Sequence, residues 1–399
     1  MSMNILWHKY RSTEKSGSKY TKWRSSICSS ILTLTVLGAT LNAHAVTLID
    51  MKNNMTADLE GKTNGYAFVI KRGAKQSTGA GGLALRPADI PGGGSLAMTT
   101  DTRSFIASVT KTISAIAILQ LLEANSMPIT AKVAPWFPDD WVIGPGFDQL
   151  TFKDLLTHET GLNQIFQGLS GAEKVNWKND WDGMKWVVEN GAIPNASSSY
   201  KNMNYVFSTV LIPALWKASG ASDATFTGLT EGNRGLLYVW YVTNHIFKPS
   251  GVAVGASCTA SEFYAAQAMA YDVDLPRQEG HMSETSWPNC GGHTGLRLSA
   301  QDLAKIMQAL VDGKLLSSGY RFAMNWFRLG WNKLSSTNSN GRKNKWWHGG
   351  DWFTAGDREY HACVMTYYPE KIAASLVVNS RIAGKGACTI LKDAYNNAQ

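Results

Sequence analysis

The hydrophobic pattern of the chain is strand-like near both ends and helix-like in the middle. Residues 66–70 form an apolar run that turns at Arg72-Gly73 and predicts a strand. Further strands are predicted near the other end, at residues 326–329, 346–347, 361–367 and 374–378, followed by a short helix at residues 389–397. We interpret residues 46–64 as a polar leader, and residues 79–95, which are rich in Gly and Pro, as a loop.

The middle of the chain is predicted to be mostly helical. Residues 112–122 are largely apolar and contain no Gly or Pro, which predicts a helix that ends near Asn125. Residues 206–216 are a second apolar run, which we interpret as core, and residues 302–311 predict a helix stopped by Gly313. This order favours an α/β (α+β) fold, in which an antiparallel sheet built from both chain ends is flanked by helices and carries a large, mostly helical insertion. We expect one domain over residues 46–399, with an α/β part (46–110 and 303–399) and a mainly helical part (111–302).

The first 45 residues have the features of an export signal. A basic stretch ends at Arg24, an apolar stretch covers residues 27–41, and Ala43-His44-Ala45 supplies small residues at the two positions read during cleavage. The apolar stretch is too short to span a bilayer comfortably. We therefore expect a cleaved signal, no membrane span after cleavage, and a periplasmic or secreted protein. A retained membrane anchor is the alternative.

The formal net charge of +8 does not indicate a nucleic-acid partner. Six Lys or Arg and one Glu lie in the first 45 residues, so the expected signal carries five of the eight net charges. No stretch dense in Lys and Arg follows, and we expect a small-molecule or peptide-like substrate instead. His158-Glu159 lacks a second His one helical turn later, so the sequence predicts no zinc site, and we expect no cofactor. The sequence does not indicate an oligomeric state.

Cysteine usage favours disulfides. Cys28 lies in the expected signal, and four cysteines remain after it: Cys258, Cys290, Cys363 and Cys388. An even number in an exported protein suggests two disulfides, for which three pairings are possible. We favour the sequence-local pairs, Cys258–Cys290 and Cys363–Cys388, with buried free thiols as the alternative.

Ser108 and Lys111 form the first candidate catalytic motif. They lie three residues apart where a polar loop meets the predicted helix. Positions i and i+3 share one helix face, so the Lys111 amine can reach the Ser108 oxygen. Serine is a poor nucleophile without an adjacent proton acceptor, and this pair therefore indicates acyl-transfer chemistry.

Two further short motifs add polar groups suited to the same chemistry. In Tyr200-Lys201-Asn202, a lysine ammonium can lower the pKa of the phenol so that it accepts a proton from serine. Asn202, in an extended loop, can point the same way and donate to a substrate carbonyl. In His348-Gly349-Gly350, the glycines allow a ligand to approach a strand whose N–H groups can serve an oxyanion hole. Taken singly, Tyr-x-Asn is common and is also found in surface turns, and a lone His in a strand is more often structural.

In this order, Ser-x-x-Lys, Tyr-x-Asn and His-x-Gly resemble the signature of the β-lactamase and penicillin-binding-protein superfamily. The resemblance is to its class C-like branch, which includes esterases, D,D-peptidases and D-aminopeptidases. Residues 102–111 are similar to the family's approach to the nucleophile. Residues 155–162, LLTHETGL, are similar to its LLTHTSGL segment, and residues 295–303 resemble its Ser-x-x-Asp-Leu entry to a helix. The resemblance covers most of the chain after residue 45 and implies a β-lactamase/transpeptidase-like fold.

The resemblance also implies roles for individual residues. Ser108 would be the acylated nucleophile, and Lys111 and Tyr200 would share proton transfer. Asn202 would hold the acyl-side amide or carbonyl of the substrate, and His348 would make a polar contact near the leaving group. The oxyanion hole would consist of the backbone N–H groups of Ser108 and Asp351, beside Gly349 and Gly350. His158 would have a structural role in its loop.

Three departures from the family pattern bear on the substrate. His348 replaces a lysine, and a mostly neutral imidazole loses part of the field that attracts a substrate carboxylate. Gly349 lacks a hydroxyl that β-lactamases use to bind that carboxylate. Asp351 either points into the protein or repels anions from the site. The aromatic side chains Trp346, Trp347, Trp352 and Phe353 are candidates for an apolar wall, with core packing as the alternative.

These departures weaken the case for β-lactam hydrolysis. We expect an exported serine hydrolase that acts through an acyl-enzyme on an ester or amide, with carboxylesterase-like activity. The alternatives are a D,D-peptidase or D-aminopeptidase, a β-lactamase-type amide hydrolase, and a non-catalytic penicillin-binding or cell-wall sensor protein with the same fold.

Overall fold

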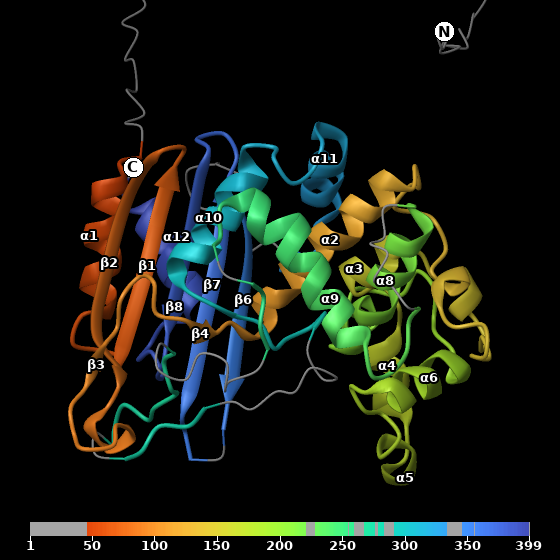
Figure 1. The fold of residues 1–399 in the computed structure, drawn as a ribbon, viewed down its shortest axis with the longest axis horizontal. Coiled ribbons are helices and arrows are strands. Elements are labelled where there is room, and N and C mark those ends of the chain that lie inside the picture. Colours follow the sequence, from red (N-terminus) through yellow and green to blue (C-terminus); the bar gives the residue numbers. More distant parts are fainter. Residues whose placement is uncertain are drawn as a thin grey trace, which may run out of the picture. The chain divides into compact units, whose positions relative to one another are not determined.

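The two ends of the described chain meet in one antiparallel sheet of six strands. The computed structural model describes residues 46–220, 228–253, 255–258, 267–275, 278–282, 291–332, 345–354 and 356–398, so the expected export signal and Cys290 lie outside it. The strands are β1 (Gly65–Arg72), β2 (Lys75–Leu85), β3 (Leu96–Ala97), β6 (Lys345–Phe353), β7 (Glu359–Tyr367) and β8 (Ile372–Val378). Their order in the sheet is β3-β2-β1-β8-β7-β6, and β1 from the first part of the chain pairs directly with β8 from the last part (Figure 1). The predicted α/β fold is therefore confirmed.

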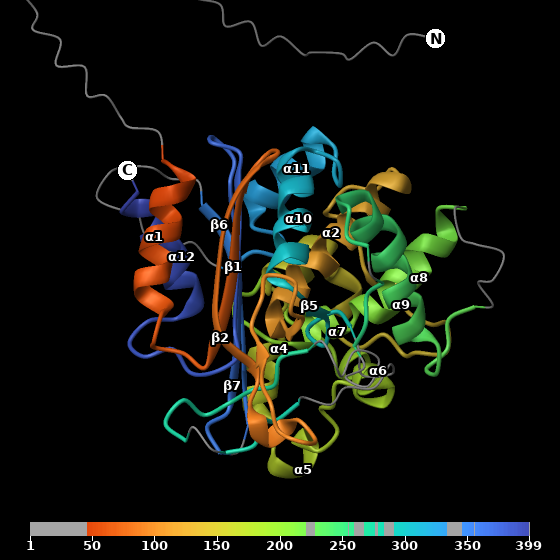
Figure 2. The same cartoon turned by 60° about the vertical axis from the view of Figure 1, so that its left-hand side comes forward.

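Helices cover both faces of this sheet. In Figure 2, α1 (Leu48–Leu59) and α12 (Ala387–Asn396) lie on one side of the strands, and α10 (Ala300–Val311) and α2 (Thr110–Ala124) lie on the other. Along β1, Phe68 and Ile70 join the hydrophobic cluster of α1 and α12, whereas Ala67 and Val69 join the cluster on the α2 side. Because successive side chains of a strand face opposite sides, a strand buried on both faces is apolar throughout.

The middle of the described chain consists of helices and loops, as predicted. After α2 come α3 (Phe152–Thr157), α4 (Leu162–Gly168), α5 (Gly171–Lys174), α6 (Trp181–Asn190), α7 (Met203–Val206), α8 (Ser208–Ala218) and α9 (Arg234–Val242). Short 3-10 turns, a π-helical turn at Thr243–Phe247 and a small sheet of β4 (Ser104–Phe105) and β5 (Arg297–Leu298) complete this part. The expected helix over residues 302–311 is α10, and Ser299 caps it with a reciprocal bond to Asp302.

Three local predictions are wrong, each because a tertiary contact overrides the local pattern. The expected polar leader contains α1, whose Met51, Met55 and Leu59 recur at helical spacing and pack on the sheet. The expected loop at 79–95 begins inside β2, where a Cβ on Gly79 would lie 2.3 Å from the ring of Phe68 on the paired strand. This glycine thus makes room for a cross-strand aromatic ring. The expected strand at 326–329 is the end of α11 (Ser318–Phe327), which Arg328 terminates in the left-handed conformation.

A disulfide joins β7 to α12. Cys363 and Cys388 are bonded, which confirms one of the two favoured pairs. Cys258 is also disulfide-bonded.

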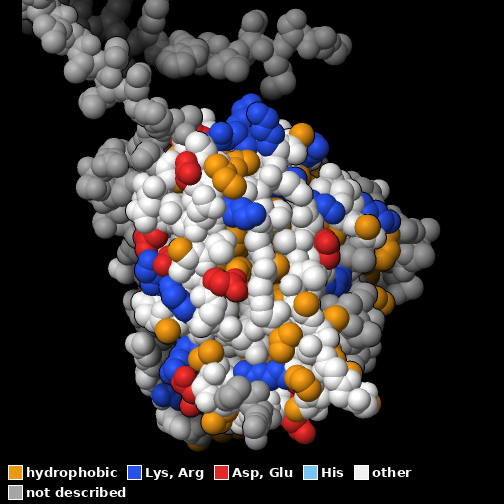
Figure 3. Space-filling view, turned by 90° about the vertical axis from the view of Figure 1, so that its left-hand side faces the viewer, with side chains coloured by type: hydrophobic (Ala, Val, Ile, Leu, Met, Phe, Trp, Pro, Cys, Tyr) orange, Lys and Arg blue, Asp and Glu red, His pale blue; other side chains and the backbone are white. Residues whose placement is uncertain are grey.

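The central helix α2 is apolar on all sides because it is surrounded by protein. Residues 107–124 form the one helical stretch of the described residues that is long and apolar enough to cross a membrane, and 78% of that stretch is buried inside the structure. On the face that carries α1 and β2 (Figure 3), hydrophobic side chains are scattered among charged ones of both signs. That face therefore offers neither a broad apolar patch nor a single-sign charge field.

Candidate active site

A sharp turn brings Ser108 to the start of the central helix. Ala107 adopts the left-handed conformation with φ 44°, which is unfavourable by about 1–2 kcal/mol for a residue other than glycine. Ser108 follows in a 3-10 turn, Ala107–Val109, that runs directly into α2. Because α2 is packed on all sides, the position of Ser108 is fixed by the core.

Three polar groups meet at this point. The Lys111 Nζ atom lies 2.9 Å from Ser108 Oγ, as the i, i+3 spacing predicts. Tyr200 donates its hydroxyl to Ser108 Oγ over 2.8 Å, although 92 residues separate the two in the chain. The structure thus brings together the three residues for which we predicted catalytic roles.

Lys111 sits in an environment that disfavours its charge. Its side chain is fully buried, and Nζ donates to the His293 carbonyl oxygen at 2.8 Å in addition to Ser108. In the part of the chain that the structure describes, no carboxylate forms an ion pair with it. Burial therefore lowers the pKa of Lys111 well below its ordinary value of 10.5. A neutral amine next to a serine hydroxyl can accept its proton.

The pKa of Tyr200 moves opposite to our expectation. Desolvation of the phenol raises its pKa to about 12, although the hydrogen bond that Tyr200 donates to Ser108 opposes the shift, and the nearby Asp351 carboxylate adds to it. We predicted a lowered pKa from a neighbouring lysine, and this was wrong because loss of water dominates the shift and no lysine charge contributes to it. Tyr200 thus keeps its proton and is suited to donate it, while Lys111 is suited to be the base.

The segment of residues 155–162 contacts the loop that carries Tyr200. His158 ends α3 in the left-handed conformation, and its ring lies 4.6 Å from the ring of Tyr200, centroid to centroid. Its Nδ1 accepts from the backbone N–H of Lys201 at 3.4 Å and lies 2.9 Å from Asn204 Nδ2. Burial and the Lys111 charge lower the pKa of His158 to about 3, so the ring stays neutral. These contacts fit the structural role in its loop that we expected for His158.

Asn202 begins α7 and lines the pocket next to Tyr200. Its backbone is helical, with φ −56°, and not extended as we expected. The Asn202 carbonyl oxygen accepts the N–H groups of Tyr205 and Val206, which fixes the turn that carries Tyr200. Asn202 is among the residues that line the cavity in front of Ser108.

Strand β6 passes alongside Ser108 because Gly350 has no side chain. A Cβ on Gly350 would lie 2.2 Å from the Ile106 carbonyl oxygen and 2.9 Å from the Ser108 backbone nitrogen. This close approach requires glycine. β6 is the outermost strand in the order of the sheet, and Asp351 follows Gly350, so its backbone N–H comes next along the strand that flanks the nucleophile.

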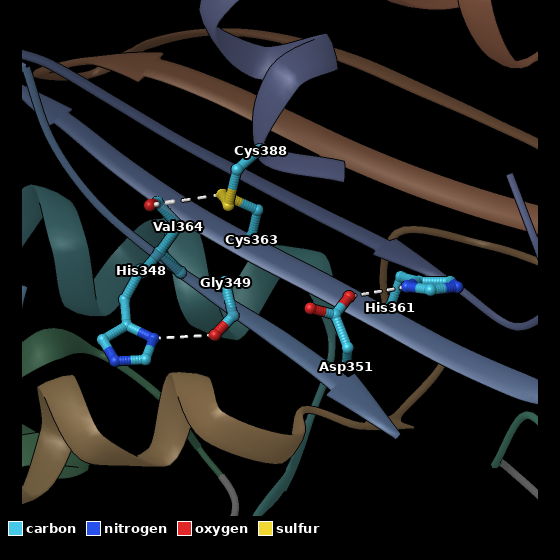
Figure 4. Close-up of a disulfide and its surroundings, with 7 residues drawn as sticks. All are labelled: His348, Gly349, Asp351, His361, Cys363, Val364 and Cys388. Carbon is cyan, nitrogen blue, oxygen red and sulfur yellow. Dashed lines mark hydrogen bonds and ion pairs between the residues drawn. A yellow bond between two sulfur atoms is a disulfide. The ribbon is translucent and has the colours of Figure 1, made fainter. Parts of the chain in front are cut away.

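His348 is buried, neutral and faces the α2 side. Burial and the charge of Lys111 lower its pKa to about 3. Its Nδ1 lies 2.7 Å from the Gly349 carbonyl oxygen, which places the ring proton on Nδ1 and leaves Nε2 as an acceptor (Figure 4). Gly349 has the opposite orientation, since a Cβ there would lie 3.1 Å from Cys388 Sγ.

Asp351 lies at the rim of the same pocket with a histidine partner. Its Oδ1 lies 2.6 Å from His361 Nδ1 across the β6–β7 pair, and His361 Nε2 lies 2.6 Å from Glu359 Oε2 (Figure 4). The Asp351 side chain is 55% exposed, and because side chains alternate along a strand it extends to the face of β6 that Gly349 shares, opposite to His348. His361 and Glu359 carry no motif, and sequence reasoning missed them.

These groups enclose a cavity of about 570 Å³. It is lined by Ser108, Tyr200, Asn202, Asn332, Trp347, His348, Gly349 and Asp351. Sequence reasoning missed Asn332, whose backbone N–H bonds to the Trp347 carbonyl at the edge of β6. Of the four candidate wall aromatics, Trp347 lines the cavity, whereas Trp352 packs on Phe105 at 5.8 Å between ring centroids.

A second, smaller cavity of about 290 Å³ adjoins the first at Tyr200 and Asn202. Lys201 Nζ lies over the Phe166 ring at 3.0 Å and over the Trp177 ring at 5.0 Å. Burial lowers the pKa of Lys201 to about 8, and the charge of Lys174 adds to this. The adjoining cavity therefore combines aromatic walls with one cation.

The described residues offer no site for a metal ion, since no group of three or more His, Cys, Asp or Glu side chains gathers in a suitable way. What the arrangement provides is a serine hydroxyl, a buried amine to accept its proton and a phenol to donate one, next to a strand edge with backbone N–H groups. These are the parts needed for nucleophilic acyl transfer.

Comparison with known proteins agrees with this geometry. The profile of the Beta-lactamase family matches residues 51–390. A curated Bacillus subtilis (strain 168) protein, PbpX, named as a penicillin-binding protein, is 27% identical over 220 residues, which are 54% of this chain and 48% of that protein. The chain thus spans about half the length of this curated relative.

Solved structures show the same fold. A D-stereospecific amidohydrolase from Streptomyces sp. superposes with a TM-score of 0.57 and 20% identity, over 88% of this chain and 98% of that one. A D-amino acid amidase from Ochrobactrum anthropi SV3 gives a TM-score of 0.59 and 17% identity, over 88% and 97%. An octameric penicillin-binding protein homologue from Pyrococcus abyssi gives 0.56 and 20%, over 87% and 75%.

Proposed function

The chain belongs to the Beta-lactamase family, and on that basis we propose that it is a serine hydrolase that forms an acyl-enzyme on Ser108. The observation that carries the proposal is the contact of Ser108 Oγ with both Lys111 Nζ and Tyr200 OH, at 2.9 and 2.8 Å. A non-catalytic sensor that binds without turnover does not need this set of proton-transfer groups.

In the proposed reaction, neutral Lys111 takes the Ser108 proton as the Oγ atom attacks the substrate carbonyl. The backbone N–H groups of Ser108 and Asp351 stabilise the negative oxygen that forms. When the carbonyl–leaving-group bond breaks, Tyr200 donates its proton to the leaving atom and is reprotonated from the Lys111 ammonium. Attack by water, with the same groups in reverse, then releases the acid and frees Ser108.

We propose esters or amides without a carboxylate next to the reacting bond as substrates, with carboxylesterase-like activity. Support comes from His348, which is neutral because its pKa is lowered to about 3, and from Gly349, which has no hydroxyl to bind a carboxylate. A β-lactam carboxylate would find no cation among the side chains that line the main cavity. Amide hydrolysis, as the names of the two amidase neighbours describe for those proteins, remains within the proposal. We also propose export, on the features of residues 1–45.

A fluorophosphonate probe tests the nucleophile. Wild type should be labelled, and Ser108→Ala should not. Ser114→Ala is the matched control, because Ser114 is a buried serine of the same helix, bonded to Tyr238 and Gly292, and its loss should leave labelling intact. Equal labelling of wild type and Ser108→Ala would contradict the proposal. Rapid turnover of p-nitrophenyl acetate would separate the hydrolase from a sensor, which would instead retain labelled penicillin without turnover.

A further inference from the structure

Helix α11 exposes aromatic side chains on its outward face. Phe322 and Trp326 are 64% and 69% exposed, and their rings stack with 5.7 Å between the centroids. Phe327, at the end of the helix, is 39% exposed. Of the five aromatic side chains that are exposed in the described part of the chain, three therefore lie on this one helix.

The opposite side of α11 already holds the helix on the rest of the protein. Met324 is buried, and the Tyr320 hydroxyl donates to the Met127 carbonyl oxygen at 2.5 Å. Trp346 Nε1 donates to the Asn325 carbonyl oxygen at 2.9 Å. Because the inner face is packed, folding does not require apolar groups on the outer face as well. The exposed rings therefore indicate a surface that binds something outside this chain.

The stretch of chain that contains α11 has no acidic residue. Residues 313–350 include seven Lys or Arg and no Asp or Glu, so they carry +7, whereas the whole chain after residue 45 carries +3 (+8 less +5). The cations are spread out, and the lack of acids is what distinguishes the stretch. Three of the cations, Lys314, Arg321 and Arg328, lie in α11 or within four residues of it.

Two acidic groups approach the first turn of α11. Glu123 Oε2 accepts the Ser317 backbone N–H at 3.4 Å, and Asp312 precedes Gly313, against which the Arg321 guanidinium lies. Trp326 is nine residues beyond Ser317, roughly 13 Å along the helix axis. That distance exceeds the screening length of about 8–10 Å at physiological salt. The end of the helix that carries Trp326 is terminated by Arg328 and is therefore positive.

Aromatic rings next to cations fit the surface of a bilayer that contains anionic lipids. Trp and Phe rings bind at the level of the headgroups, and nearby Lys and Arg are attracted to the negative surface. A second copy of this chain fits less well, because a symmetric contact would place the same positive stretch against itself. On the face that carries α1 and β2 (Figure 3), charges of both signs are mixed, so that face lacks this combination.

The position of α11 allows such docking. Figures 1 and 2 both show α11 at the upper edge of the molecule, where a flat surface can reach it. Asn332, which lines the main cavity, follows Phe327 by five residues, which span at most about 18 Å. Docking through α11 would therefore hold the cavity close to the lipid surface.

We propose that α11 is a docking surface for a bilayer containing anionic lipids, with Phe322, Trp326 and Phe327 among the headgroups and with Lys314 and Arg328 against the negative charges. The contact is peripheral and adds no membrane span. This inference goes beyond the proposed hydrolase and does not depend on it.

Sedimentation with lipid vesicles tests the binding. Wild type should bind vesicles of phosphatidylglycerol mixed with phosphatidylcholine more tightly than vesicles of phosphatidylcholine alone, and added salt should weaken the difference. Phe322→Ser/Trp326→Ser should lower the binding constant about tenfold or more, because the rings supply the apolar contact. Lys314→Gln/Arg328→Gln should lower binding to the anionic vesicles about tenfold and leave binding to the neutral ones.

The matched control is Val142→Ser/Leu236→Ser. It also removes two exposed apolar side chains, 66% and 54% exposed, but from other elements, and vesicle binding should remain. Thermal unfolding of every variant shows that it folds.

Quenching of fluorescence locates the contact even if residues 27–41 also bind lipid. Phosphatidylcholine brominated on its acyl chains is added to the anionic vesicles, and the emission of wild type is compared with that of Trp326→Phe, which keeps an aromatic ring at this position. The part of the emission that Trp326 contributes should be quenched.

Three outcomes would overturn the proposal. The first is that wild type does not bind the anionic vesicles. The second is that Phe322→Ser/Trp326→Ser binds as well as wild type and the emission of Trp326 is not quenched. The third is that light scattering finds a wild-type dimer that this double variant converts to a monomer, without vesicle binding, since a second copy would then be the occupant.

Discussion

Two histidines on neighbouring strands of one sheet respond to burial in opposite ways. His348 on β6 and His361 on β7 are both buried, with 2% and 8% of their surface exposed. The pKa of His348 is lowered to about 3, because burial and the Lys111 charge act without a carboxylate in contact. The pKa of His361 is raised, because Asp351 and Glu359 each accept a hydrogen bond from it.

The interior of the site and its rim differ in the same way, in whether the pKa of a buried basic group is lowered or raised. In the interior, burial lowers the pKa of Lys111, His158 and His348, and this favours the neutral form of the amine beside the nucleophile. At the rim, the two carboxylates bonded to His361 raise its pKa although it is buried. Depth alone therefore does not decide ionisation in this protein; the supply of hydrogen-bonding partners does.

Substitution of Lys111, in the interior of the site, should have the largest effect. Lys111→Met should lower the rate of Ser108 acylation by about 10³-fold or more, since the proton acceptor is lost. Lys111→Arg should lower it as much, because arginine keeps a positive charge but cannot lose its proton. The measurement is the acylation rate with a p-nitrophenyl ester, alongside thermal unfolding to show that each variant folds. An active arginine variant would mean that charge, and not proton transfer, is the contribution of Lys111.

Tyr200 gives the next largest effect. Tyr200→Phe should slow acylation about 10²- to 10³-fold, because the leaving atom loses its proton donor. Tyr205→Phe is the control: Tyr205 lies in the same segment and donates to the Leu156 carbonyl, away from Ser108. Its loss should cost about 1 kcal/mol of stability and little rate. Similar rates for the two variants would remove Tyr200 from the reaction.

The smallest effect is on stability as a function of pH, and it should have opposite signs for the two histidines. The folded-state pKa of His348 is about 3, so the unfolded chain binds more protons below pH 6.5, and wild type loses about 1.4 kcal/mol per pH unit through this residue on acidification. His348→Gln should therefore lose less stability than wild type as the pH falls from 6.5 towards 3.

For His361 the folded-state pKa is raised, so its stabilisation is complete below pH 6.5 and is lost as the pH rises through that higher value. His361→Gln should be most destabilised relative to wild type in acid, with the difference shrinking at higher pH. Chemical denaturation of both variants across pH 4.5–9 measures the two trends. Parallel curves for the two variants would contradict the comparison.

Periodicity and short motifs predicted much of the fold and of the site. Continuous apolar runs predicted β1, β7 and β8 because strands buried on both faces leave that pattern. The i, i+3 spacing predicted the contact of Ser108 with Lys111. The sequence did not predict α1, because three apolar residues among polar ones gave a weak helical signal. It did not predict β2, because the glycines of this strand, which make room for aromatic rings of β1, are also typical of a loop.

What the sequence could not give depends on pairing and burial. The bond between Asp351 and His361 follows from the register of β6 against β7, which no local pattern encodes. The His293 carbonyl that binds Lys111 lies 182 residues from it in sequence. The direction of the Tyr200 pKa was wrong because desolvation is a property of the folded structure.

The disulfide of Cys388 lies next to Gly349 and limits which side chain can stand at this position of the cavity. Because a Cβ at residue 349 would come within 3.1 Å of the sulfur, acquiring a serine or threonine there would require the cross-link or the strand to shift. The cystine therefore disfavours a side-chain hydroxyl at residue 349, the position at which the resemblance implies that β-lactamases hold a carboxylate.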